Sequence, residues 1–340
     1  MAPASSIPSV EKSLDRKLAA LRANPDANVF ILADAKDADL AWGCASPGDP
    51  WPPERRSFRS LQEFQDQMRE IVRRGLVDIL LASPATHSRL AKDEEVFRGT
   101  AVTPAVRAND TTDVWRNRGA SYRDAASLPF AACTVEELQD LNVDLGLYSM
   151  TFNNSVESDR ETLECFHRFR REAKRRNFRY FAEFFPPNIV DCGIPLDRIA
   201  AFCNDGIART LAGVPHQNSP EFLKVPYWGP RALEELRNFD STLIVGILGG
   251  GAGTTHDAFK LLADAKRHGA RCALFGRKIK DAEDPFAFLA ILRSVADDDL
   301  PARDAVRIYH ERLKEANVTP RRSLDQDLEI TFDDLTFTRL

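Results

Sequence analysis

The 340-residue sequence lacks the short motifs by which many enzyme classes are detected. It has no G-x-G-x-x-G opening its first apolar run and no G-x-x-x-x-G-K-[ST], so nucleotide cofactors have no motif to bind them. Its six histidines form no H-E-x-x-H or other metal-ligand grouping, and no serine lies in a G-x-S-x-G context. We therefore predict no metal and no cofactor, and hydrolase chemistry is unsupported.

Paired cysteines and long apolar runs are also missing. None of the six cysteines belongs to a C-x-x-C pair, which favours reduced thiols over a disulfide or metal framework. The first ten residues contain neither a charged n-region nor an apolar h-region, and no run of about 18 apolar residues occurs. These absences predict a cytoplasmic protein without a membrane span or a cleaved signal.

Positive charge is in slight deficit, with a formal net charge of −5. This balance argues against nucleic acid as the main partner. Basic residues do cluster at 168–176, but Phe166 and Phe169 beside them keep helical spacing, which is typical of a solvated helix face. We expect a small phosphorylated sugar as the partner, no nucleic acid and no membrane, while a homo-oligomer stays open.

Short apolar runs alternate with helical patterns along most of the chain. This alternation predicts a parallel sheet, with a (β/α)₈ TIM barrel as the first choice and an open doubly wound sheet as the second. We expect one barrel domain over 1–340, with a helical N-terminal extension over 1–27, extra C-terminal helices and a polar tail over 319–340. The polar stretch 109–129 is interpreted as a surface insertion. The predicted strands are 28–34, 77–83, 100–107, 143–152, 178–185, 222–225, 242–248 and 271–275.

In a barrel of this kind, the active site gathers at the carboxyl ends of the strands. The polar or glycine residues at those ends are Asp34, Ser83, Arg107, Tyr148, Glu183, Lys224, Gly249 and Arg277. Lys224 is the foremost of them, because it ends an apolar run in FLKVPY. An apolar, cation-rich mouth disfavours its charged form, and a neutral amine attacks a ketone or aldehyde to form an imine. Alternatively, the side chain extends from a strand end to solvent.

Three other strand-end residues are candidates for proton transfer. Glu183 lies among aromatic residues, which should raise its pKa and suit a proton shuttle, although it could equally orient a neighbouring cation such as Lys224. Asp34 could orient the lysine or a substrate hydroxyl, or it could cap a local turn. Tyr148 could act as a phenolic acid or be a half-buried barrel tyrosine.

Two consecutive strand ends could hold phosphate. Gly249, Gly250 and Gly251 lead into a helical pattern near Thr255, where backbone N–H groups and the helix dipole favour an anion. At the next strand end come Gly276 and Arg277, and arginine grips phosphate as a fork. The loops after strands seven and eight are the usual phosphate site in barrels. A tight turn is the alternative explanation for the triglycine.

Together these pieces resemble the class I, Schiff-base aldolases of the tagatose-bisphosphate type, and more distantly the archaeal-type fructose-bisphosphate aldolases. The resemblance rests on FRYFAEFFPP, FLKVPY, ILGGGAGTTHDAFKLLADAKRHGA, CALFGRKI and the first strand VFILADAKDADLAWG. It implies that Lys224 forms the imine, Glu183 moves protons and Asp34 lies beside the reacting carbons. It also implies that Gly249 to Gly251 and Arg277 hold a phosphate.

The chain departs from that family at one functional position. The tagatose-type enzymes carry a second lysine near the start of strand four, where this chain has Asp144 or Leu145. Lys36 or Arg107 is the proposed substitute for binding the substrate. The loop over 42–53 and the insertion over 109–129 are also unlike the family, and both border the predicted mouth.

The sequence therefore predicts a metal-independent class I aldolase, a lyase of carbohydrate metabolism that makes or breaks a C–C bond beside a phosphorylated ketone or aldehyde. One alternative is a phosphosugar isomerase or epimerase that uses Glu183 and Asp34 as acid and base without an imine. Another is a barrel without catalytic activity that senses a sugar phosphate.

Overall fold

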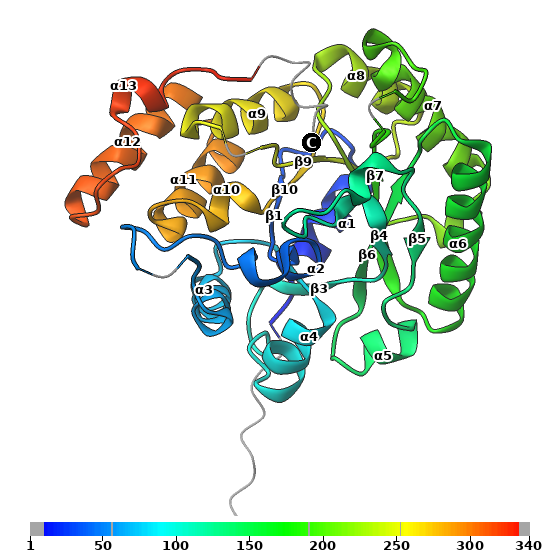
Figure 1. The fold of residues 1–340 in the computed structure, drawn as a ribbon, viewed down its shortest axis with the longest axis horizontal. Helices are drawn as coiled ribbons and strands as arrows, with labels where there is room; N and C mark the ends of the chain where they lie inside the picture. Colours follow the sequence, from blue (N-terminus) through cyan, green and yellow to red (C-terminus); the bar gives the residue numbers. More distant parts are fainter. Residues whose placement is uncertain (1–9, 56, 190, 252, 333–340) are drawn as a thin grey trace, which may run out of the picture.

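Eight parallel strands close into a barrel in the computed structural model, which describes residues 10–332 apart from 56, 190 and 252 (Figure 1). Around the barrel, the strands follow the order β1-β10-β9-β8-β7-β6-β3-β2. They are β1 (Ile31–Ala35), β2 (Ile79–Ala82), β3 (Thr103–Arg107), β6 (Leu145–Thr151), β7 (Arg179–Phe185), β8 (Leu223–Val225), β9 (Val245–Leu248) and β10 (Cys272–Phe275). The predicted (β/α)₈ barrel is confirmed, and the open sheet is wrong.

Helices form the outer layer of the barrel. The long ones are α3 (Leu61–Arg74), α6 (Val156–Arg175), α7 (Ile199–Ala212), α8 (Pro230–Phe239), α9 (Thr255–Arg267), α11 (Pro285–Asp297) and α12 (Ala302–Glu315). The short ones are α2 (Ala38–Trp42), α4 (Pro84–His87), α5 (Val135–Gln139), α10 (Arg277–Lys280) and α13 (Leu324–Asp327). Within the described residues, no helix combines the length and the apolar composition that crossing a bilayer requires.

Side-chain caps fix where several helices begin. Ser60 accepts from the backbone N–H of Glu63 at the start of α3, and the Glu63 carboxylate accepts from the backbone N–H of Ser60 in return. Thr134 and Glu137 form the same reciprocal pair at the start of α5. Each cap satisfies backbone donors that the first helical turn leaves without a partner.

The strands separate two apolar clusters by strict alternation. On β1, Ile31 and Ala33 point into the barrel, whereas Leu32 packs outward against the helices. On β6, Leu145 and Leu147 point inward in the same way. Successive strand residues face opposite sides of a sheet, so a single position decides whether a strand-end side chain reaches the interior.

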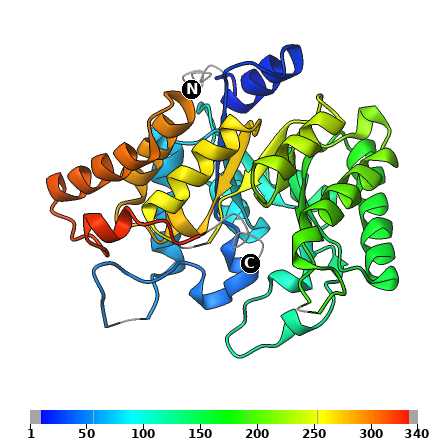
Figure 2. The same cartoon turned by 90° about the horizontal axis from the view of Figure 1, so that it is seen from above.

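Helix α1 (Ser13–Ala23) closes the amino-terminal end of the barrel. Its buried residues Leu14, Leu18 and Leu21 belong to the same cluster as the barrel interior. Figure 2 places α1 at the end of the barrel opposite α2 and the segment that follows β3. The N-terminal extension thus fills one end, and the other end remains for a site.

The segment after β3 is not the simple surface insertion that its polarity suggested. It contains the short strands β4 (Asp110–Thr111) and β5 (Pro129–Phe130), which pair antiparallel. Asn109, Asp113 and Ser127 are buried in it. Ser127 Oγ donates to Asp113 Oδ1 at 2.6 Å, and Thr151 Oγ1 of β6 donates to Asp113 Oδ2 at 3.1 Å. These internal hydrogen bonds explain how a polar sequence packs over the barrel mouth.

We expect Leu18→Ala to lower the free energy of unfolding by about 2 to 4 kcal/mol, because it leaves a cavity in the plugged end of the barrel. Equilibrium denaturation in urea measures the change. Leu61→Ala is the matched control, since Leu61 is 46% exposed at the start of α3. Equal losses in the two variants would contradict the assignment of α1 to the barrel core.

Candidate active site

Lys224 and Glu183 face each other inside the mouth of the barrel. They occupy paired positions on the adjacent strands β8 and β7, and both follow inward-facing aromatic residues on their strands. Lys224 Nζ lies 2.6 Å from Glu183 Oε1. The lysine is 5% exposed and the glutamate 1% exposed. A buried amine beside a buried carboxylate is able to exchange a proton with it directly.

Glu183 is surrounded by donors and cations rather than by aromatic rings. Ser149 Oγ of β6 donates to Glu183 Oε2 at 2.6 Å, and Arg107 Nη1 of β3 lies 3.5 Å from the same oxygen. Burial alone would raise the pKa of Glu183, but the charges of Lys224 and Arg107 outweigh it and hold the pKa below its ordinary value. The expected upward shift is therefore wrong, because two cations reach the carboxylate.

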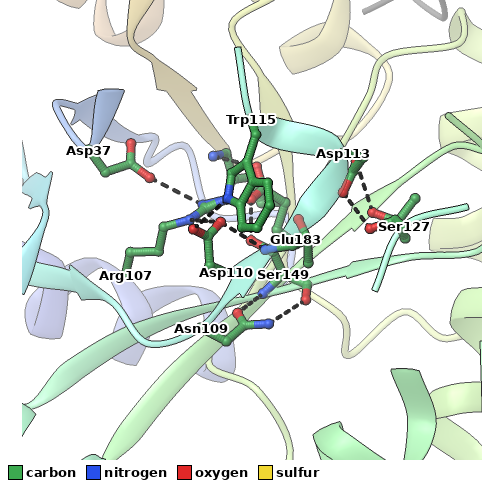
Figure 3. A network of polar contacts seen from close by, with 12 residues as sticks. Asp37, Arg107, Asn109, Asp110, Asp113, Trp115, Ser127, Ser149 and Glu183 are labelled. Carbon is green, nitrogen blue, oxygen red and sulfur yellow. Dashed lines mark hydrogen bonds and ion pairs between the residues drawn. The ribbon is translucent and has the colours of Figure 1, made fainter. Parts of the chain in front are cut away.

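Arg107 joins the two acidic parts of the site. Its Nη1 is 3.2 Å from Asp37 Oδ2 as well as close to Glu183, and its Nε is 4.0 Å from Asp110 Oδ1. Figure 3 shows the guanidinium between the Asp37 and Glu183 carboxylates. A planar arginine with five donors suits such a bridging position.

Ser149 is fixed by the segment that packs over the mouth. Asn109 Nδ2 donates to the backbone oxygen of Ser149 at 2.9 Å, and the backbone N–H of Ser149 donates to Asn109 Oδ1 at 2.7 Å (Figure 3). Asp110 accepts from Trp115 Nε1 at 3.1 Å in the same segment. The hydroxyl that contacts Glu183 therefore has a rigid backbone behind it.

A cavity of about 180 Å³ brings most of the predicted residues together. Its lining includes Lys224, Glu183, Arg107, Gly249, Gly250, Gly276 and Arg277. It also includes Asp37 and Arg116, which the sequence analysis did not select. Lys224, Glu183 and part of the glycine turn thus share one chamber.

Asp34 and Lys36 lie outside this chamber, contrary to prediction. Asp34 is on the outward face of β1, and both side chains are fully buried beneath α3. Lys36 Nζ is 3.4 Å from Asp34 Oδ2 and donates to Gln67 of α3 at 2.5 Å. Burial raises the pKa of Asp34 to about 6, a shift that Lys36 only partly offsets. Strand alternation sends this pair away from the barrel interior.

Tyr148 is also directed away from the chamber, so its predicted role as a proton donor fails. Its ring stacks on Phe169 at a centroid distance of 4.5 Å and tilts against Phe166 at 5.2 Å, both on α6. Its neighbour Ser149 faces inward instead. Alternation counted from the apolar residues Leu145 and Leu147 would have selected the serine.

Close packing accounts for two of the glycines. A Cβ on Gly249 would approach Phe275 to 2.6 Å, and one on Gly276 would approach the backbone oxygen of Ala35 to 2.6 Å. Gly250 adopts φ +68°, which favours glycine. Gly251 does not line the chamber and faces the ring of Phe332 instead. The turn is therefore shaped by tertiary contacts, and its binding of phosphate stays a prediction.

The amino-terminal end of α9 is occupied by carboxylates of the chain itself. The backbone N–H of Thr254 donates to Asp257 Oδ2 at 2.8 Å, and that of Thr255 donates to Asp327 Oδ1 at 2.7 Å. Asp327 belongs to α13, in the region interpreted as a polar tail. Two carboxylates at a helix start repel another anion, so the expected contribution of this helix dipole to phosphate binding is wrong.

Replacing the Glu183 carboxylate with a neutral amide tests how much this charge contributes to the stability of the fold. We expect Glu183→Gln to lower the free energy of unfolding by about 3 to 5 kcal/mol at pH 7, because Lys224 and Arg107 would remain buried without it. The folded pKa of Glu183 is lowered, so its stabilisation exists above the unfolded pKa of about 4.3 and is lost as pH falls through the folded value.

Urea denaturation across this pH range tests the expectation, with Glu164→Gln on the exposed face of α6 as the matched control. The difference between the parent and Glu183→Gln should shrink on acidification. A difference that grows as pH falls would show that the carboxylate is protonated in the fold.

Comparisons with known proteins bear on the fold. No protein-family model matches the sequence, and no curated protein matches it as a relative. Solved structures do match over nearly their full length. A Schiff-base-forming fructose-1,6-bisphosphate aldolase shares 17% identity at a TM-score of 0.60, covering 83% of this chain and 99% of its own.

Two further structures give the same picture. An archaeal fructose-1,6-bisphosphate aldolase, solved with its catalytic lysine bound to the carbinolamine intermediate, shares 14% identity at a TM-score of 0.62, over 84% of this chain and 99% of its own. A fructose-bisphosphate aldolase from Slackia heliotrinireducens shares 13% identity at a TM-score of 0.63, over 90% and 94%. The chain thus has the fold of the class I aldolases, as the resemblance implied.

Proposed function

We propose that this protein is a class I aldolase that forms an imine between Lys224 and a phosphorylated keto or aldehyde sugar. The observation that carries the proposal is the buried contact of 2.6 Å between Lys224 Nζ and Glu183 Oε1, in a chamber shared with Gly249 and Gly250. The similarity in fold to Schiff-base aldolases supports it further. The tagatose-bisphosphate subtype remains a prediction from the sequence.

The reaction begins with a proton transfer from Lys224 to Glu183. The neutral amine attacks the substrate carbonyl carbon, and the carbonyl oxygen takes up a proton to give a carbinolamine. Glu183 returns a proton to that hydroxyl, which leaves as water, and a protonated imine remains. The short hydrogen-bonded path allows one carboxylate to serve in both steps.

Bond cleavage then uses the imine as an electron sink. A base removes the proton from the hydroxyl on the far carbon of the breaking C–C bond, and that carbon leaves as an aldehyde. The electron pair of the broken bond forms the double bond of an enamine, while the C=N pair moves to the imine nitrogen. Protonation of the enamine and hydrolysis release the second product and the free lysine. We assign the second carboxylate in the chamber, Asp37, to the hydroxyl, in place of Asp34. Arg107 holds both carboxylates in position.

An isomerase without an imine is less well supported by the same geometry. Such an enzyme needs a carboxylate free to remove a proton from carbon. Both oxygens of Glu183 are instead occupied, Oε1 by Lys224 and Oε2 by Ser149 and Arg107. Its contact with Lys224 favours chemistry at the amine.

Borohydride reduction in the presence of a phosphorylated ketose should trap a covalent adduct on Lys224. We expect the adduct to disappear in Lys224→Met and to persist in Lys174→Met, a matched change at an exposed lysine of α6. Peptide mass spectrometry locates the adduct. Turnover that survives Lys224→Met and resists borohydride would rule out the imine.

Asp37 and Asp34 provide a matched pair of conservative variants. We expect Asp37→Asn to lower kcat/KM by about 10²- to 10⁴-fold, as for loss of a proton-transfer group, and Asp34→Asn to change it by less than about threefold. Steady-state kinetics on folded protein measures both. A larger loss of kcat/KM in Asp34→Asn than in Asp37→Asn would show that Asp34, and not Asp37, takes part in the reaction.

A further inference from the structure

A second cavity of about 420 Å³ adjoins the chamber that contains Lys224. The two cavities share Trp42, Arg277 and Lys280 in their walls. The second cavity is closed by two segments from distant parts of the sequence, the loop before α3 and the connection between α12 and α13. Figure 2 shows these segments side by side, and the Trp51 indole Nε1 donates to the backbone oxygen of Thr319 at 2.7 Å.

The lining of the second cavity is rich in positive charge. Five cationic side chains contribute to it, against three carboxylates, although the chain as a whole carries a net charge of −5. The cations are Arg277, Lys278, Lys280, Arg321 and Arg322, and the carboxylates are Asp49, Asp281 and Glu283. Such a local reversal of sign marks a place that attracts anions.

Two of the three carboxylates already have structural partners. Glu283 Oε1 accepts from the backbone N–H of Arg321 at 2.7 Å, and Glu283 Oε2 accepts from the Tyr309 hydroxyl at 3.0 Å. Asp281 is paired with Lys280 at 3.1 Å. These contacts hold the wall of the cavity together, and one of them, between Asp281 and Lys280, pairs two of the lining charges.

Three of the remaining cations contact uncharged groups. Lys278 Nζ donates to the backbone oxygen of Gly253 at 2.8 Å, and Arg277 Nη2 donates to that of Gly250 at 3.0 Å. Arg321 lies over the Trp51 ring at 4.5 Å, and in the described part of the chain its buried Nε has no hydrogen-bond partner. Lys278 is buried and Arg277 and Arg321 are half-buried. An anion between them would add a countercharge in direct contact, which these uncharged partners do not supply.

Lys278 is held among charges of both signs. Burial, more than the charge of Arg322, lowers the pKa of Lys278 to about 8, while Asp327, Glu283 and Asp257 act in the opposite direction. The cost of burying its ammonium therefore outweighs the stabilisation from these carboxylates.

We propose that the second cavity binds a phosphoryl group, with Lys278 and Arg321 as its principal contacts. Arginine and lysine are the side chains that proteins use for this purpose, the first as a fork and the second as a point charge. The start of α9 nearby is closed to such a group by Asp257 and Asp327, so the proposed contacts are side chains and not the end of that helix. This site is separate from Lys224 and does not depend on imine formation.

Titration of the full-length protein with inorganic phosphate in low-salt buffer tests the proposal. We expect Arg321→Gln and Lys278→Met each to weaken phosphate binding by about tenfold or more, as for loss of a charge-assisted contact. Arg175→Gln, a matched change at an exposed arginine of α6, should bind as the parent does. If Arg321→Gln binds as tightly as Arg175→Gln, or if the parent binds no phosphate, the proposal is overturned.

The phosphoryl group could belong to the far end of a substrate that also reaches Lys224 or to a separate molecule. Titrations of Lys224→Met with mono- and bisphosphorylated ketoses distinguish these sources without any turnover. The double variant Lys224→Met/Arg321→Gln is then compared with Lys224→Met. If it binds the bisphosphorylated ketose more weakly but the monophosphorylated ketose equally well, the cavity holds a second phosphate of the substrate. Simultaneous binding of a monophosphorylated ketose and inorganic phosphate identifies a separate ligand. These binding measurements do not depend on the borohydride experiment, so they can be interpreted even if no adduct forms on Lys224.

Discussion

The buried contact between Lys224 and Glu183 is the interaction on which the chamber depends. An ammonium and a carboxylate in such a place stabilise each other only if further partners satisfy the remaining oxygen, and Ser149 and Arg107 do so. The same contacts tie three other strands, β3, β6 and β7, to β8. Charge balance and chemistry therefore share one set of side chains, and a change at any of them alters both.

The segment between β3 and α5 (Val135–Gln139) shows how a polar sequence can support a buried site. Asn109 holds the backbone of Ser149, while Asp113 joins Ser127 to Thr151. Each buried polar group in this set has a partner, which allows the segment to pack over the mouth. Its composition resembles that of a loop, but its hydrogen bonds make it part of the wall behind the reacting groups.

The two cavities are built from different parts of the chain. The chamber is built from strand ends, whose positions are fixed by the barrel. The second cavity uses loops from the two ends of the sequence, and its charge comes from Arg321, Arg322 and the short helix α10. Because Trp42, Arg277 and Lys280 lie between them, a ligand in one cavity contacts the wall of the other.

Apolar runs and the chemistry of strand ends are local signals, and they were enough to predict the barrel, Lys224, Glu183 and Arg107 at its mouth, and the glycine turn after β9. The same signals also predicted Asp34, Lys36 and Tyr148 at the mouth, and this is wrong, because a shift of one residue along a strand turns the side chain toward the helices. That Asp327 caps α9 and that Glu183 is held between two cations follows from the folding of the whole chain. Those contacts join residues far apart in the chain, and a local sequence pattern does not predict which distant charged residue will lie next to a given side chain.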